Sequence, residues 1–386
     1  LNPWKRRRTT VMFAVLAFVS IAGFFFWCSR LYGLGYPLDD AWIHQTYARN
    51  FAQTGQWTFS PGKTSGGSTG PLWGLLLSIM HLAQLPELVG TAFLGWVILC
   101  STAVFTVDLV LASEPESKIN RILVGAIILF EWHLVWSAGS GMETLLFGLM
   151  ALIVVSRIKD LERNFWLTGF FAGISVWIRP GGLTLIAPVL FVLAFSNIDQ
   201  KLNKIGQALI GFLIPVIPYF LFNYFVIGDF WPNTFYAKQA EYVELTNQPL
   251  LKRYWTVIYQ LLVGVGVLLL PGFVRKVYLA VKDRDWYSIG AFCWVIGYVS
   301  IYAFKLPVDY QHGRYAMPVF PIFLGFGIAG SADWLAWNTD VVWRRIIGRV
   351  FWVSVGLVSF AFWLQGANAF ANDVAIIETE MVSAAK

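Results

Sequence analysis

The sequence predicts an all-α polytopic membrane protein with about eleven transmembrane helices and juxtamembrane helices in its first extracytoplasmic loop. The composition is the first observation behind this prediction. Hydrophobic residues make up 57% of the 386 residues and charged residues only 13%, far from the balance of a soluble domain. The second is that apolar segments of transmembrane length recur along the chain between short polar loops.

The predicted spans follow these apolar segments, because a helix needs roughly 17–25 apolar residues to cross the hydrocarbon. The three segments between residues 142 and 197 are short, and one adjacent pair among them could be re-entrant. The predicted spans are 9–28, 88–112, 122–138, 142–156, 165–178, 183–197, 205–227, 255–273, 286–304, 316–336 and 346–366.

The distribution of Lys and Arg predicts the orientation, since these residues collect in cytoplasmic loops. With the N-terminus in the cytoplasm, 18 of the 28 Lys and Arg residues lie on the cytoplasmic side. We therefore expect residues 1–366 to form one transmembrane domain, with the loop 29–87 and a short tail, 367–386, outside the cell. This register requires residues 71–85, which begin with Pro71, to lie at the interface rather than to cross.

The net charge of +6 does not predict nucleic-acid binding. The basic residues form short runs between apolar segments instead of covering a soluble face, so a topological role explains them better. No nucleic-acid partner is therefore expected. Membrane lipids are the expected surroundings.

The unusual polar residues fall on one side of the membrane under this orientation. They lie at the outer ends of the predicted spans, where lipid-borne substrates present their head groups. This placement predicts an extracytoplasmic active site at the membrane surface. The segments concerned are Asp39 and Asp40, the turn 64–70, residues 141–144, Arg179, residues 228–238 and residues 309–318.

Six segments follow one another in order from about residue 36 to 320: DDAWIHQTYARN, STGPLW, SGMET, IRPGG, GDFWPNTFYAK and GRYAMPVFP. In this pattern the chain resembles the C-type (GT-C) glycosyltransferases that use polyprenyl-phosphate sugars, in particular the mycobacterial-type terminal arabinofuranosyltransferases. The resemblance implies a multi-pass protein of the bacterial inner membrane with a donor such as decaprenyl-phospho-arabinose. It also implies an extracytoplasmic glycan, lipid or protein acceptor, and an acidic residue on the first outer loop as general base.

Asp40 and Asp39 are the candidate catalytic residues. One carboxylate would take the proton of the acceptor hydroxyl while its neighbour orients that hydroxyl or helps to hold a divalent cation such as Mg, Mn or Ca. The structural alternative is a helix N-cap, because Asp before AWIHQTYARNF is a good capping residue. Both readings hold if Asp39 is the cap and Asp40 the base.

A phosphate leaving group needs positive charge or aligned N–H donors. Arg314, with His312 beside it, is the first choice. Lys238, Arg179 and Arg49 come next. The alternatives are snorkelling to lipid head groups for the arginines and membrane anchoring for Lys238.

Two further residues are candidates for substrate contact. Glu143 is a second acidic residue at an outer helix end, with a helix cap as its alternative. His44 would line the sugar pocket or be a polar residue of the interface. Residues 65–70 would offer backbone N–H groups to an anion at the start of the Pro71 helix, or form a flexible turn.

Glu131 and His133 lie within the third predicted span, where ionisable residues are costly. Residues two apart do not share one face of a continuous helix, so the sequence does not predict a proton relay there.

Two other classes compete with the glycosyltransferase. A secondary transporter would place its charges near the middle of the membrane on broken helices, often within an internal repeat, whereas these charges collect at one surface. A non-catalytic scaffold within a larger membrane complex is the stronger alternative. It predicts that Asp39→Asn has no effect.

Overall fold

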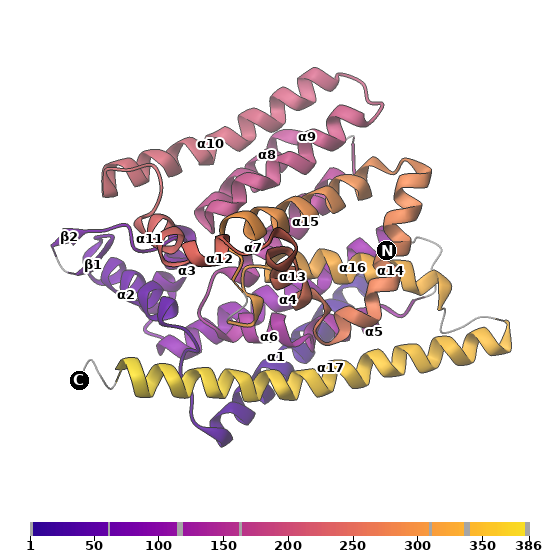
Figure 1. Ribbon diagram of the computed structural model, residues 1–386, viewed down its shortest axis with the longest axis horizontal. Coiled ribbons are helices and arrows are strands. Elements are labelled where there is room, and N and C mark those ends of the chain that lie inside the picture. Colours follow the sequence, from indigo (N-terminus) through magenta and orange to yellow (C-terminus); the bar gives the residue numbers. More distant parts are fainter. Residues whose placement is uncertain are drawn as a thin grey trace.

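The computed structural model describes residues 3–60, 62–113, 119–161, 164–308, 311–335 and 340–382. Helices make up almost all of this part of the chain, which confirms the predicted all-α class (Figure 1). The only sheet within these ranges has two short antiparallel strands, β1 (Thr58–Ser60) and β2 (Lys63–Thr64).

Six helical segments in the described ranges are long and apolar enough to cross a membrane, so the chain is a multi-pass membrane protein. The last of them continues to Val382 as a short π-helix and is therefore longer than the predicted span 346–366. The six are α1 (Pro3–Leu31), α4 (Glu87–Ser113), α10 (Lys201–Ile227), α15 (Trp286–Lys305), the run Gln311–Ala332 that contains α16 (Phe320–Trp334), and α17 (Val342–Ile376).

Two bent helix pairs raise this number to eight if each counts as one span. The pair α5 (Arg121–Leu129) and α6 (Trp132–Gly139) bends by 54°, and the pair α13 (Leu250–Leu262) and α14 (Val265–Asp283) bends by 104°. The predicted span 255–273 therefore covers the end of α13 and the first part of α14, and it is not one continuous helix. Gly264, at the second break, has φ 79° and ψ −131°, a conformation that is essentially restricted to glycine.

The three remaining predicted spans are helical but short. They correspond to α7 (Thr144–Ile158), to α8 (Phe165–Ile174) with η1 (Ser175–Trp177), and to η2 (Pro180–Leu185) with α9 (Ile186–Phe195). Helix length and composition therefore support six to eight spans, and the predicted number of eleven is not confirmed.

The loop 29–87, which the sequence predicts to be extracytoplasmic, contains two helices, as predicted for juxtamembrane elements. These are α2 (Asp39–Thr54) and α3 (Pro71–Leu82), with the two strands between them. In Figure 1, α2 and the strands lie at the end of the molecule where α17 ends, beside α11 (Asn233–Glu241) and close to α12 (Val243–Thr246). The polar loops thus gather at one end of the helical bundle.

The segment Gln311–Ala332 runs through the centre of the bundle. Its most apolar window is completely buried. It begins with two short helices, η3 (Gln311–Gly313) and η4 (Met317–Val319), and then continues as α16, which packs against α4 and α14. The residues between η3 and η4 are thereby held inside the protein.

The third predicted span is broken at Phe130 and Glu131. Glu131 is the N-cap of α6, where its carboxylate accepts a hydrogen bond from the Leu134 backbone N–H at 3.0 Å and lies 2.7 Å from His133 Nδ1. The two side chains thus meet, although residues two apart share no face of a continuous helix. The break makes this possible, because it turns Glu131 toward the first turn of α6.

Candidate active site

Asp40 lies at the centre of a cluster of charges. Its Oδ2 accepts hydrogen bonds from Arg314 Nη2 at 2.7 Å and from Lys238 Nζ at 3.1 Å. These partners come from the start of the central segment and from α11, 274 and 198 residues away in sequence. The fold thus joins three of the residues that the sequence singled out.

The start of α2 orients this carboxylate. The helix begins at Asp39, and its N-cap is Leu38, which makes no side-chain capping bond. The proposed N-cap role for Asp39 is therefore displaced by one position. Asp39 Oδ1 instead accepts the Asp40 backbone N–H at 2.8 Å, satisfying a donor of the first turn. Asp39 therefore supports the backbone, while Asp40 faces the cations.

The environment keeps Asp40 ionised. Burial raises its pKa, but the charges and hydrogen bonds of Arg314 and Lys238 outweigh burial and hold the pKa well below the usual range of an aspartate. In the protein without substrate, Asp40 is thus a stable anion and a weak base.

Glu143 forms a second buried acidic centre. It occupies the N-cap position of α7 but makes no side-chain capping bond. Its Oε1 lies 3.6 Å from Arg179 Nε and its Oε2 lies 3.3 Å from His44 Nε2. The other ring nitrogen of His44 lies 3.3 Å from Ser68 Oγ, which belongs to the glycine-rich turn before α3. The turn therefore supports a side chain of the site.

One cavity of about 550 Å³ joins the two centres, because Glu143, Arg179, Lys238 and Arg314 all line it. Aromatic side chains organise its wall. The guanidinium carbons of Arg179 and Arg314 each lie 5.0 Å from the centre of the Tyr315 ring, within cation–π range. Apolar residues complete the lining, among them Met142, Leu183, Trp231, Ile301 and Leu306.

The cationic side chains of this cavity retain unused hydrogen-bond donors. Arg314 and Arg179 are 2% and 7% exposed. Arg314 Nε and Nη1 and Arg179 Nη1 are shielded from solvent and have no hydrogen-bond partner. With Lys238 and Lys305, the described part of the lining has four cationic side chains, and the nearby carboxylates among the described residues are those of Asp40 and Glu143. Buried donors without partners and excess positive charge favour an anionic ligand.

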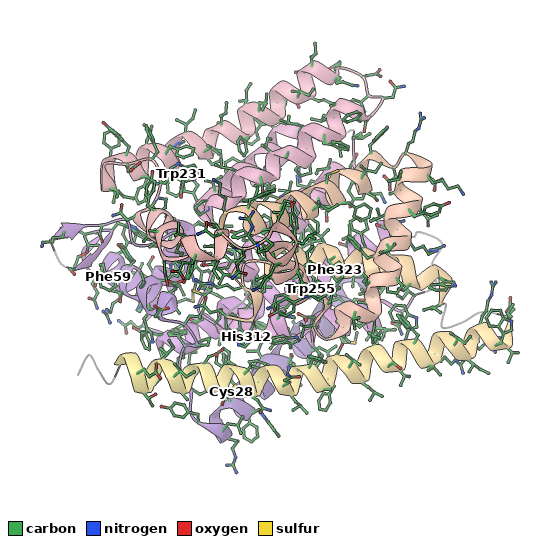
Figure 2. The ribbon with its side chains drawn as sticks, in the orientation of Figure 1. Cys28, Phe59, Trp231, Trp255, His312 and Phe323 are labelled. Atoms are coloured by element: carbon green, nitrogen blue, oxygen red, sulfur yellow. The ribbon has the colours of Figure 1, made fainter. Side chains whose placement is uncertain are left out.

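Two predicted site residues lie elsewhere. His312 Nε2 contacts Asp373 Oδ2 of α17 at 2.8 Å. Figure 2 shows His312 beside α17 and well apart from Trp231, which lines the cationic cavity. Arg49 is on the outer face of α2, where its side chain is 48% exposed and lies 3.9 Å from Glu87. Asp309 and Tyr310, in the stretch 309–318, lie outside the described residues.

The acidic residues do not fit a divalent cation in this arrangement. Two cationic side chains already compensate the Asp40 carboxylate, and Asp39 is bonded to the backbone. Within the described ranges, no group of three or more His, Cys, Asp or Glu side chains is placed to hold a metal ion. We therefore derive no step through a metal.

Tyr302, Lys305 and Tyr315 are among the residues of this cavity that were not predicted from the sequence. Tyr315 adjoins Arg314 in the GRYAMP motif, and its hydroxyl accepts a hydrogen bond from Arg314 at 3.0 Å. Tyr302 stacks on Tyr315 with ring centres 5.3 Å apart. Lys305 lies one helical turn further along α15, in the last turn of that helix. The spacing of Tyr302 and Lys305 on one helix face was the available signal.

The arrangement of helices is that of the GT-C glycosyltransferase fold. ArnT from Cupriavidus metallidurans bound to undecaprenyl phosphate superimposes with a TM-score of 0.58 and 13% identity, over 95% of this chain and 77% of that chain. The apo state of the same ArnT superimposes with a TM-score of 0.60 and 13% identity, over 97% of this chain and 80% of that chain.

The apo oligosaccharyltransferase of Archaeoglobus fulgidus gives a TM-score of 0.61 and 11% identity, over 95% of this chain and 56% of that chain. No protein-family model and no curated protein matches the sequence. These similarities establish the fold of the chain.

Proposed function

We propose that this protein is a glycosyltransferase that moves a sugar from a polyprenyl-phosphate donor to an acceptor hydroxyl outside the bacterial inner membrane. The observation that carries the proposal is the excess of buried cationic groups with unused donors beside the Asp40 carboxylate. Such a site suits a phosphate next to a base. The structural similarity to an ArnT bound to undecaprenyl phosphate supports the same donor class.

The charges provide a way to couple donor binding to catalysis. The donor phosphate would compete with Asp40 for Arg314 and Lys238, the two groups that lower the pKa of Asp40. As these cations turn to the phosphate, the pKa of Asp40 rises and the carboxylate becomes a stronger base. The base is thus activated only when a donor is present.

The transfer itself needs one proton acceptor and one stabilised leaving group. The bond between the anomeric carbon and the phosphate oxygen breaks, and the acceptor oxygen bonds to that carbon while its proton passes to Asp40. Arg314, Lys238 and Arg179 stabilise the charge that develops on the departing prenyl phosphate. The apolar walls around Trp231 and Ile301 would hold the first isoprene units.

The proposal also includes the identity of the transferred sugar and the side of the membrane on which the site lies. The sequence resemblance favours arabinofuranose, and the distribution of Lys and Arg favours a site on the extracytoplasmic side. Glu143, held by Arg179 and His44, would bind sugar hydroxyls at the far side of the cavity.

The test compares Asp40→Asn with Asp39→Asn in sugar transfer from a polyprenyl-phosphate donor. A general base contributes typically 10²–10⁴-fold to the rate. We expect Asp40→Asn to lose about that factor while it still binds prenyl phosphate, and Asp39→Asn to lose less because its carboxylate supports only the backbone.

Transfer by Asp40→Asn at the wild-type rate would exclude this mechanism. A wild-type protein that binds prenyl phosphate but is inert with every donor of this class would favour the alternative, a non-catalytic scaffold in a larger membrane complex.

A further inference from the structure

A second cavity, of about 500 Å³, lies beside α17 and outside the cationic site. Its lining comes from α6, α13, η3 and α17, together with the segment before α2. The polar and aromatic side chains that line it are Trp132, Tyr259, Gln260, Gln311, His312, Gln365 and Asp373.

The pair His312 and Asp373 sits at this cavity in a fixed orientation. Their nitrogen and oxygen are 2.8 Å apart, and the side chains are 24% and 27% exposed, so both remain accessible. Two indole rings confine the imidazole in edge-to-face contacts, with ring centres 5.5 Å away for Trp132 and 5.4 Å for Trp136. The pair thus offers polar atoms to a ligand from a rigid support.

The composition of this lining differs from that of a lipid groove. A third cavity, between α1 and α4, has an entirely apolar lining that includes Phe18, Phe25 and Phe93. In the second cavity, amide groups accompany a carboxylate and an imidazole. Amides both donate and accept hydrogen bonds, which matches hydroxyl groups, and flat aromatic faces pack against the C–H groups of a sugar ring.

The second cavity adjoins the cationic site through two short segments. Pro37 and Leu38 line the second cavity, and Asp40 follows two residues later. His312 lines the second cavity, and Arg314, two residues on, lines the first. Two residues of chain span at most about 7 Å. A molecule in the second cavity would therefore lie near the carboxylate that we propose as the base.

The wall between the cavities is strained and incompletely bonded. Gln311 and His312 have φ values of 58° and 56°, in the left-handed region that non-glycine residues rarely adopt. Two atoms of the lining, Gln311 Oε1 and Trp132 Nε1, are buried without a hydrogen-bond partner. Strain and unsatisfied polar groups concentrate at binding sites, where a ligand repays their cost.

We propose that the second cavity binds a neutral saccharide and that this saccharide is the acceptor of the transfer. The role of this saccharide as acceptor rests on the proposed function, whereas its binding can be measured without any sugar transfer. Gln260, Gln365 and Asp373 would bind its hydroxyls, and Trp132 would pack against its ring.

The experiment measures alkylation of one introduced cysteine in the full-length protein, after Cys28, Cys100 and Cys293 have been replaced by Ala. Ala369→Cys reports on the second cavity, which Ala369 lines. Ile301→Cys is the matched reporter in the cationic cavity. The probes are methyl glycosides of pentoses and hexoses, and undecaprenyl phosphate.

We expect at least one methyl glycoside to slow alkylation of Ala369→Cys several-fold and to leave Ile301→Cys unaffected. Adding Gln365→Leu, or separately Asp373→Asn, should abolish this protection while Ile301→Cys in the same backgrounds reacts as before, which shows that the protein is folded.

The inference is overturned if no glycoside protects Ala369→Cys, or if undecaprenyl phosphate protects both reporters, because the second cavity would then be part of the lipid site. Failure of undecaprenyl phosphate to protect Ile301→Cys contradicts the proposed donor site instead, so the two failures are distinguishable.

Discussion

Arg314 binds Asp40 and Tyr315 through a single nitrogen, Nη2, and its two other nitrogens are buried without partners. We expect Arg314→Ala to weaken prenyl-phosphate binding by about 2–5 kcal/mol, as truncation of one member of a buried charged pair does. Arg314→Lys should recover part of this, because a point charge lacks the planar fork of arginine.

Equilibrium binding of undecaprenyl phosphate measures this effect. Arg49→Ala is the matched control, since Arg49 is exposed on α2 and pairs only distantly with Glu87. An Arg314→Ala protein that binds as tightly as the Arg49→Ala control would assign Arg314 to the structure alone.

Lys238, together with Arg314, lowers the pKa of Asp40. Because the folded-state pKa of Asp40 is lowered, its carboxylate is ionised at neutral pH. The negative charge is lost only as the pH falls through that lowered pKa. Lys238→Met removes one of the two cations that lower the pKa, so the pKa rises. The acidic limb of kcat/KM should therefore move to higher pH.

The pH profile of sugar transfer tests this shift apart from any loss of rate. Lys305→Met removes the same charge from the cavity lining, but Lys305 makes no bond to Asp40. Lys305→Met should lower the rate of sugar transfer but move the acidic limb of kcat/KM less far than Lys238→Met does. Equal shifts in the two variants would mean that Lys238 acts only through the general field of the cavity.

Helix packing between α8 and α10 depends on glycines. A Cβ added to Gly211 would lie 1.9 Å from the backbone oxygen of Trp166, and one added to Gly169 would lie 2.0 Å from that of Ala208. The two helices approach so closely only because these positions lack a side chain. α8 also packs against η2, whose N-cap is Arg179.

Gly211→Ala should therefore destabilise the protein by about 1–3 kcal/mol, the usual cost of overpacking. Gly206→Ala is the control on the same helix, because nothing lies within 4 Å of its added Cβ and alanine favours the helix. Thermal unfolding in detergent measures both. An equal unfolding temperature for the two variants would show that the helices can separate without cost.

The whole molecule gathers its polar elements at one end. In Figure 1, the strands, α2 and α11 lie where α17 ends, while α14 lies toward the opposite end. If the positive-inside rule holds, the first end is extracytoplasmic. In a protein without its native cysteines, an impermeant thiol reagent added outside intact cells should modify Lys63→Cys and spare Lys282→Cys. Both positions are exposed, so access alone does not separate them. The reverse pattern would invert the orientation and move the site to the cytoplasm.

The class of the protein and most of its helices were predictable from the sequence, because burial in a membrane imposes long apolar segments whatever their arrangement. The same apolar signal could not reveal the bend at Gly264 or the break at Glu131. Hydropathy averages over a window of residues, whereas a single glycine in an unusual backbone conformation, or one N-cap carboxylate, decides where a helix ends.

The candidate site, too, was predictable from the sequence only in part. The sequence predicts that Asp40, Glu143, Lys238 and Arg314 are charged residues near helix ends, since charge is costly within the hydrocarbon. It does not predict that Asp40 contacts Arg314 and Lys238, or that His312 faces a different cavity from Arg314 although only one residue separates them. Contacts between residues hundreds of positions apart depend on how the helices pack, and the left-handed turn at Gln311 and His312 directs neighbouring side chains to opposite walls.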